Sequence, residues 1–114
     1  MRSDKVYVNG MAMKNDASDN KPPLEHLCLE HVAEMCRVFA WAEGKYPRNA
    51  DGTPNYYKGH YKLKLLAAAM RHILAAVGGE EFDPESGLSH VAHAQSSLAM
   101  IQKQKQLGTL VEGL

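Results

Sequence analysis

Apolar residues recur every three or four positions in three segments of the chain, and that is the spacing of an amphipathic helix. The segments run from Leu24 to Ala42, from about Tyr61 to Val77 and from about Ser86 to Lys105. Gly78-Gly79 follows the second segment, and glycine readily takes the left-handed conformation that ends a helix. Asp83-Pro84 or Ser86-Gly87 then opens the third helix. The pattern predicts an all-α protein, a small bundle of three to four helices.

The segments around these helices divide the chain further. Residues 1–20 show no sustained period and are predicted to form a flexible N-terminal arm. A single helical domain is expected over residues 21–106, with a C-terminal tail at 107–114. Gln102 to Gln106 is polar on all sides and is expected to fray. Glu43 to His60 is a Gly-, Pro- and Tyr-rich loop between the first two helices, longer than a simple connection needs, which favours a function for it.

The long loop carries groups that a nucleotide would need. Its basic side chains supply positive charge for phosphates, and its tyrosine rings offer faces on which a base can stack. An alternative is that the tyrosines only pin the loop to the helices, and the sequence leaves both interpretations open. The residues concerned are Lys45, Arg48, Lys58, Tyr46, Tyr56 and Tyr57.

The densest group of ionisable side chains lies between the second and third helices. Residues 78–94 hold four carboxylates, two histidines and two serines. His90 and His93 are three apart, so a helix would carry both on one face, near Ser86. This stretch is the candidate site. The alternative is a solvated, capped loop followed by two histidines that are hydrogen-bonded between helices.

Two more candidates lie on the first and second helices. Glu34 belongs to a stripe of charged residues that is either an exposed, salt-bridged edge or a source of magnesium ligands. Arg71-His72 follows three alanines, so Arg71 is placed either to reach into a cleft or to interact with the end of its own helix.

The composition narrows the classes of partner. Thirteen basic and thirteen acidic side chains cancel, so neither nucleic acid nor a membrane is expected as a partner. Cys28 and Cys36 are about 12 Å apart along a helix, too far for a disulfide, and are expected as small core residues of a reduced protein. No segment approaches the length of a membrane span, so we expect a soluble, cytoplasmic protein. A chain of 114 residues forms one domain with a small core, which favours a homo-oligomer.

Several short motifs together resemble one phage family, dATP/dGTP diphosphohydrolase, N-terminal domain. Their order and spacing match over residues 21 to 101. They are Lys21-Pro22, Gly44-Lys45-Tyr46, Asn55-Tyr56-Tyr57-Lys58-Gly59, Ala67-Ala68-Ala69-Met70-Arg71-His72, Gly79-Glu80, Asp83-Pro84-Glu85-Ser86-Gly87-Leu88 and His90-Val91-Ala92-His93-Ala94. The family usually has Asn-Trp where this chain has Asn55-Tyr56, and Trp41-Ala42-Glu43 stands where a Gly-Ala pair is common.

The resemblance implies an all-helical protein of a phage-infected bacterial cell that hydrolyses the purine deoxynucleoside triphosphates dATP and dGTP. Such a reaction needs a divalent metal, cations and an acid or base. We therefore assign roles on the matching positions. The metal, Mg²⁺ or Mn²⁺, would be held by Glu34, Glu80, Asp83 and Glu85. The catalytic residues would be His72, His90 and His93. The substrate-binding residues would be Lys45, Tyr46, Asn55, Tyr56, Lys58, Arg71 and Ser86.

Other functions stay open beside hydrolysis. If His72, His90, His93 and Asp83 converge, a transition metal is more plausible than magnesium. The chain is alternatively a non-catalytic module that sequesters a nucleotide, or a host-inhibitory phage protein that docks on a host protein through its apolar helices.

Overall fold

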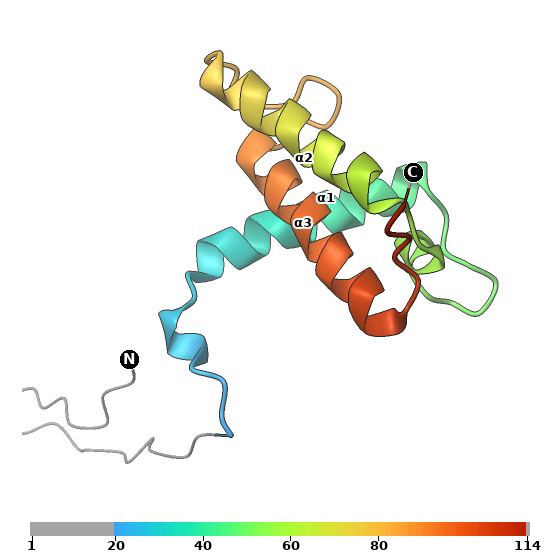
Figure 1. The fold of residues 1–114 in the computed structure, drawn as a ribbon. Coiled ribbons are helices and arrows are strands. Elements are labelled where there is room, and N and C mark those ends of the chain that lie inside the picture. Colours follow the sequence, from blue (N-terminus) through green and yellow to red (C-terminus); the bar gives the residue numbers. More distant parts are fainter. Residues whose placement is uncertain (1–19, 114) are drawn as a thin grey trace, which may run out of the picture.

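The computed structural model describes residues 20–113, and over that range the chain folds as three main helices (Figure 1). The all-α class predicted from the apolar pattern is confirmed. Most of the proposed N-terminal arm lies outside the described residues. The helices are α1, Leu29–Lys45, α2, Lys62–Val77, and α3, His90–Leu107, with 3-10 turns η1, Leu24–His26, and η2, Asn55–Lys58. None of the helices within the described range is long and apolar enough to cross a membrane.

Helix α3 is the centre of the arrangement. It packs against α2, which runs antiparallel to it, and it also contacts α1 and η2 (Figure 1). Most of its length is therefore covered by neighbours, including its polar residues. The buried side chains of α3 are those of His90, Ala92, His93, Ala94, Ser96, Ser97 and Gln104.

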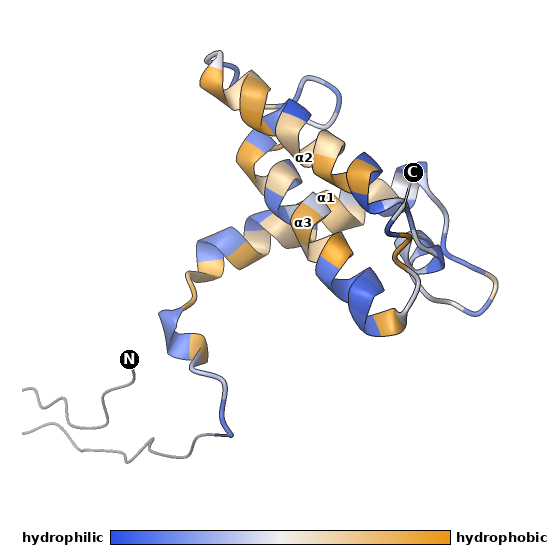
Figure 2. Cartoon of the chain, viewed as in Figure 1, coloured by the Kyte–Doolittle hydropathy of each residue, from blue (hydrophilic) through white to orange (hydrophobic). Residues whose placement is uncertain are grey.

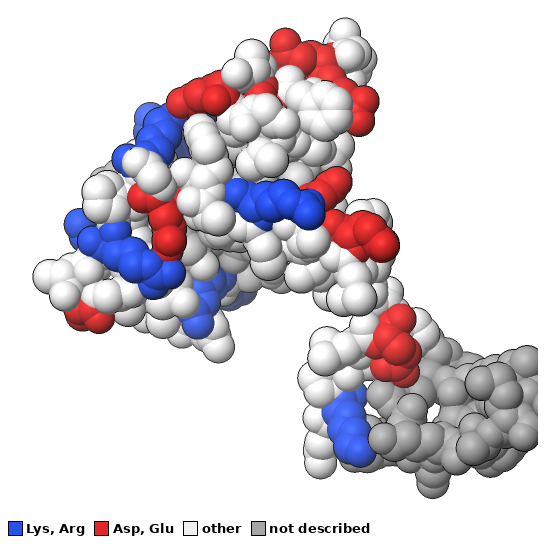
Figure 3. Space-filling view, turned by 180° about the vertical axis from the view of Figure 1, so that it is seen from behind, with Lys and Arg blue, Asp and Glu red and all other residues white. Residues whose placement is uncertain are grey.

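The apolar core is small. In the described part of the chain the buried apolar residues are Val38, Leu65, Ala69, Ala92 and Ala94. Three of the five are alanines, which let the helix backbones approach closely but remove little apolar surface from water. Several larger apolar residues are exposed instead, notably on α2, and the orange parts of the α2 ribbon in Figure 2 mark hydrophobic residues of this helix. On the face shown in Figure 3, basic and acidic side chains are interspersed.

The first helix begins later than its apolar pattern predicts. Leu24–His26 is a separate 3-10 turn, and Leu27 and Cys28 are extended before α1 starts at Leu29. The N-terminal half of α1 projects away from α2 and α3 (Figure 1), so tertiary packing does not support an earlier start. For the same reason, Cys28 and Cys36 are exposed, and their prediction as core residues was wrong.

The start of α3 was also predicted wrongly. Its N-cap is Ser89, whose hydroxyl oxygen accepts hydrogen bonds from the backbone N–H groups of Val91 and Ala92. The preceding residues form a turn in which Gly87 has φ of 74°. That left-handed conformation interrupts any helix that would begin at Ser86. The turn holds the acidic residues beside the first turn of α3.

The end of α3 is ordered by Gln104, contrary to the expected fraying of Gln102 to Gln106. Gln104 is completely buried, and its side-chain oxygen accepts from the backbone N–H of His60 at 2.9 Å. Its amide nitrogen lies 2.8 Å from the carbonyl oxygen of Tyr56 and 2.7 Å from Nδ1 of His60. One side chain therefore ties α3 to the end of the long loop. The helix then closes at Gly108, with φ of 77°.

Candidate functional site

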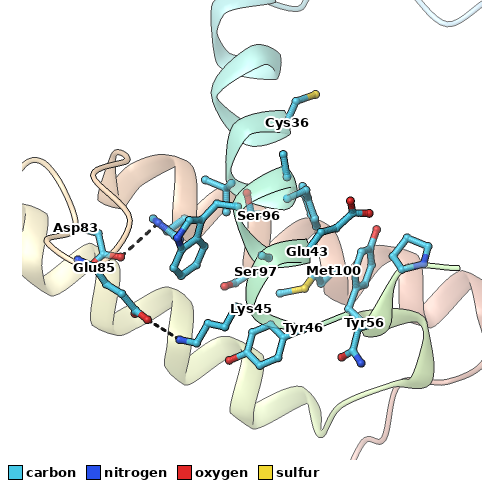
Figure 4. A pocket seen from close by; sticks show the side chains of 18 of the residues that line it. Cys36, Glu43, Lys45, Tyr46, Tyr56, Asp83, Glu85, Ser96, Ser97 and Met100 are labelled. Carbon is cyan, nitrogen blue, oxygen red and sulfur yellow. Dashed lines mark hydrogen bonds and ion pairs between the residues drawn. The ribbon is translucent and has the colours of Figure 1, made fainter. Parts of the chain in front are cut away.

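A cavity, which we call the main cavity, lies between α1, the long loop and the facing sides of α2 and α3 (Figure 4). Its volume is about 760 Å³, within the range of small-molecule sites. Side chains from five parts of the chain meet on its wall, namely α1, the long loop, α2, the turn before α3, and α3. The predicted site residues that line it are Lys45, Tyr46, Asn55, Tyr56, Arg71, His72, Asp83, Glu85 and His93.

The remaining predicted residues lie elsewhere. Glu34 lines a separate hollow of about 160 Å³. Lys58, in η2, does not line the main cavity. Glu80, Ser86 and His90 do not line it, but hydrogen bonds connect them to His72 or His93, which do.

Three histidines from two helices form a compact cluster, which we call the histidine trio. The Nδ1 atoms of His72 and His90 are 2.9 Å apart. The rings of His72 and His93 are stacked, with centroids 4.6 Å apart and an interplanar angle of 11°. The spacing of His90 and His93 thus brings both rings to the α3 face that α2 covers.

The turn at residues 80–88, which we call the acidic turn, surrounds the trio with hydrogen-bond acceptors. Nε2 of His90 is 2.7 Å from Oε1 of Glu80. Nε2 of His93 is 2.7 Å from the hydroxyl oxygen of Ser86 and 3.5 Å from Oδ2 of Asp83. The Ser86 hydroxyl in turn donates to Oδ2 of Asp83 at 3.1 Å. Each buried histidine of α3 is therefore linked to a carboxylate, directly or through one hydroxyl.

Burial sets the protonation of the groups on the cavity wall. It lowers the pKa of His72, and the neighbouring His93 and His90 lower it further. Burial likewise lowers the pKa of His93, although Asp83 acts in the opposite direction. For Asp83, burial raises the pKa, but the backbone N–H of Glu85 and the Ser86 hydroxyl outweigh it and the net shift is downward. Near neutral pH the wall thus holds neutral imidazoles beside an ionised carboxylate.

Lys45 provides positive charge on the same wall. Its Nζ atom is 2.8 Å from Oε2 of Glu85 (Figure 4), and this hydrogen bond raises the pKa of Lys45. The same atom lies 5.4 Å from the ring centroid of Trp41 and 5.6 Å from that of Tyr46. Arg71 also lines the cavity.

Aromatic rings make up much of the remaining wall. Tyr56 packs between Phe39 and Tyr57, at centroid distances of 5.3 and 5.1 Å, so it pins the long loop as well as lining the cavity. Trp41 meets the ring of His93 edge-on, with centroids 5.4 Å apart. Sequence reasoning gave Trp41 no role. The signal that could have found it is its place one helical turn before Lys45.

Two of the carboxylates predicted as metal ligands are engaged by other side chains. Among the described residues no three side chains of His, Cys, Asp or Glu are grouped to hold an ion. Glu80 is bound to His90, and Glu85 to Lys45. Asp83 and Glu85 are nevertheless both on the cavity wall. One or two carboxylates, with phosphate oxygens of the substrate, are the usual protein contribution to a magnesium site.

Comparison with known proteins adds a family. A family model described as dATP/dGTP diphosphohydrolase, N-terminal, matches residues 11–112 of the chain. The chain is 37% identical over 81 residues to a protein of Salmonella phage PMBT28 named dATP/dGTP diphosphohydrolase. That match covers 71% of this chain and 26% of the relative, so the chain spans about a quarter of the relative's length. No solved structure matches the chain.

Proposed function

Because the chain belongs to the dATP/dGTP diphosphohydrolase N-terminal family, as its motifs predicted, we propose that it binds a purine deoxynucleoside triphosphate and hydrolyses it. The observation that carries the proposal is a nucleotide-sized cavity whose wall combines cations with neutral histidines. The phage relative is itself named for dATP and dGTP. We place the reaction in the cytoplasm of a phage-infected bacterial cell.

The cavity wall offers a partner for each part of such a substrate. Lys45 and Arg71 would contact the phosphates, since ammonium and guanidinium groups donate charge-assisted hydrogen bonds to them. Tyr46 and Trp41 offer ring faces or edges to the base. Hydrolysis needs a group that removes a proton from the attacking water, and a neutral imidazole on the wall suits that role.

Magnesium or manganese stays a prediction. Asp83 and Glu85 would hold the ion together with phosphate oxygens that the nucleotide brings, whereas Glu34 and Glu80 are placed for other contacts. When bound, the metal would neutralise charge that develops on the phosphate oxygens.

The direct test is a turnover assay with each of the four deoxynucleoside triphosphates, in magnesium, manganese or chelator. We expect dATP and dGTP to give the monophosphate, with loss of activity in chelator. Asp83→Asn should lower turnover at least about tenfold, which corresponds to about 1.4 kcal/mol of barrier. Asp51→Asn is the matched control, because Asp51 is an exposed loop residue outside the cavity. Equal turnover in both variants would contradict the assignment of the site.

Nucleotide sequestration without hydrolysis is the second candidate. It is favoured by the pairing of Glu85 with Lys45 and by the fact that the chain spans only 26% of its phage relative. Calorimetric binding of dATP or dGTP with no product in any metal would identify this function.

We also propose that the chain forms a homo-oligomer through the outer face of α2. The small apolar core and the exposed apolar residues of α2 support this. A host protein on the same face would instead support an inhibitory function.

A further inference from the structure

A chain of three side chains runs from the protein surface to the cavity. Oε1 of Glu80 is 2.7 Å from Nε2 of His90, and Nδ1 of His90 is 2.9 Å from Nδ1 of His72. The Glu80 side chain is 56% exposed, whereas that of His90 is 6% exposed. Only His72 lines the cavity. We call these three residues the Glu80–His90–His72 relay.

The positions of the protons in the relay follow from its partners. An ionised carboxylate can only accept a hydrogen bond, so Nε2 of His90 carries a proton. In its neutral form the imidazole of His90 has one N–H group, and Nδ1 of His90 is then an acceptor. Nδ1 of His72 therefore donates to it, and Nε2 of His72 has no proton. In the described part of the chain no hydrogen bond engages Nε2 of His72, so its lone pair is left for a ligand.

The third histidine of the trio, His93, is held in the opposite tautomer. The Ser86 hydroxyl accepts from the backbone N–H of Leu88 and donates its one proton to Asp83. It can therefore meet Nε2 of His93 only by accepting from it. His93 thus carries its proton on Nε2, whereas His72 carries it on Nδ1. Two stacked and chemically identical rings are held in different tautomers by the acidic turn.

We infer that Glu80 and His90 are positioning residues that hold His72 as the Nδ1–H tautomer, so that Nε2 of His72 is the base for the attacking water. The inference rests on the proposed hydrolysis. In the step, an O–H bond of water breaks and its proton moves to Nε2 of His72. The oxygen forms a bond to the α-phosphorus, and the bond from this phosphorus to the bridging oxygen of the leaving pyrophosphate breaks, so that the pyrophosphate keeps the electron pair. The relay sets the tautomer before the substrate arrives, which avoids a proton rearrangement during the reaction.

The first test needs no substrate. Nitrogen-15 NMR spectra of histidine-labelled protein distinguish protonated from unprotonated ring nitrogens. We expect His72 protonated on Nδ1 alone and His93 on Nε2 alone. Glu80→Ala removes the acceptor and should let His72 and His90 exchange between tautomers, whereas Glu80→Gln retains an acceptor oxygen and should restore the wild-type pattern. Glu81→Ala is the control, because the side chain of this neighbouring glutamate makes no hydrogen bond within the described residues.

The second test uses turnover. A general base contributes about 10² to 10⁴ in rate, so His72→Ala should lower kcat by at least about a hundredfold. Glu80→Ala should lower kcat about tenfold with KM unchanged, as expected for a residue that acts through His72, and Glu80→Gln should recover most of the loss.

The results of the two tests distinguish failure of the relay from failure of the proposed hydrolysis. Active protein whose His72 is protonated on Nε2, or whose tautomers do not respond to Glu80→Ala, would overturn the relay and leave hydrolysis standing. The expected tautomers in a protein without turnover in any metal would overturn the base role of His72 together with hydrolysis, while the positioning by Glu80 and His90 would stand.

Discussion

The Lys45 ammonium on the cavity wall is bound to Glu85, so a phosphate must compete with a carboxylate for it. The two side chains come from α1 and from the acidic turn, and both are largely exposed, at 42% and 59%. An ion pair in contact with water is weak, because solvent screens the attraction and two long side chains must be ordered. A triphosphate, with several negative charges, is therefore able to displace Glu85.

The competition predicts that removing the charge of Glu85 strengthens nucleotide binding when no metal is present. In chelator, Glu85→Gln should lower the Kd for dATP about two- to fivefold, in keeping with the small worth of an exposed pair. Calorimetric titration measures the change. Glu81→Gln removes the same charge outside the cavity and should leave the Kd nearly unaltered. Weaker binding by Glu85→Gln in chelator would contradict the competition.

For individual residues, the sequence predicted which histidines lie together but not which atoms they are hydrogen-bonded to. The spacing of His90 and His93 indicated a shared face, and that face is indeed the one that His72 contacts. The partner of each ring nitrogen depends on the turn at residues 80–88, whose path no periodicity encodes. Glu34 failed to join the cavity for a similar reason, because a helical stripe does not tell which neighbour covers it.

Helix α3 is anchored at its C-terminal end by a polar side chain rather than an apolar one. Gln104 satisfies a donor of His60 and an acceptor of Tyr56 in a completely buried position. Removing it would leave the backbone N–H of His60 without a partner, and the carbonyl of Tyr56 would keep only its hydrogen bond from the N–H of Gly59.

We therefore expect Gln104→Ala to lower the free energy of unfolding by about 1–3 kcal/mol, the usual cost of buried polar groups without partners. Denaturant titration at pH 8 measures it. Gln102→Ala, two residues earlier and exposed, should change stability by less than about 0.5 kcal/mol. Equal effects of the two substitutions would show that the end of α3 is frayed in solution.

The same contact predicts a pH dependence. Burial lowers the pKa of His60 in the folded chain. As the pH falls below the usual histidine pKa of about 6.5, the unfolded chain therefore binds a proton that the folded chain does not, and stability falls. His72 and His93 shift in the same direction. The free energy of unfolding should therefore be smaller at pH 5.5 than at pH 7.5. His60→Asn keeps an acceptor near the Nδ1 position and should reduce this difference. His31→Asn, at an exposed site, should leave the difference unaltered. Greater stability at pH 5.5 would contradict the prediction.

The elements themselves were predictable in number and type, whereas their ends were not. Sequence periodicity placed the three helices, but the start of α1 depends on packing and the start of α3 depends on Ser89 and on the left-handed Gly87. Ser86 and Ser89 are equally good capping residues by type. Only the fold of the turn decides that Ser89 caps the helix while Ser86 binds His93.

For the whole molecule, the all-α class could be predicted from the sequence, but the central position of α3 could not. A buried helix is normally recognised by apolar residues all round. Helix α3 instead buries histidines, serines and a glutamine, so its polar sequence gave no sign that it would be the most covered element. The cavity follows from this arrangement, because α1 and α2 both rest on α3 and their polar residues meet over it.

The outer face of α2 shows what the small core leaves uncovered. Met70, Ile73, Leu74 and Val77 follow the spacing of one helical stripe, and they are 59%, 48%, 64% and 78% exposed. The stripe is apolar along the upper part of α2 in Figure 2. A helix stripe of this kind is self-complementary about a two-fold axis, the commonest symmetry of protein oligomers. The formal net charge of zero adds no repulsion between two copies.

We therefore expect the chain to form a dimer in which the α2 stripes of two copies pack together. Sedimentation velocity over a range of concentrations should show the dimer, and Leu74→Glu should shift it to monomer, because a charge would be buried in the interface. Leu24→Glu places the same charge at an equally exposed apolar residue of η1 and should leave the dimer intact. Circular dichroism checks that both variants keep their helices. A wild-type chain that stays monomeric would contradict self-association, and the stripe would then be covered by a different protein or by a further part of a longer chain.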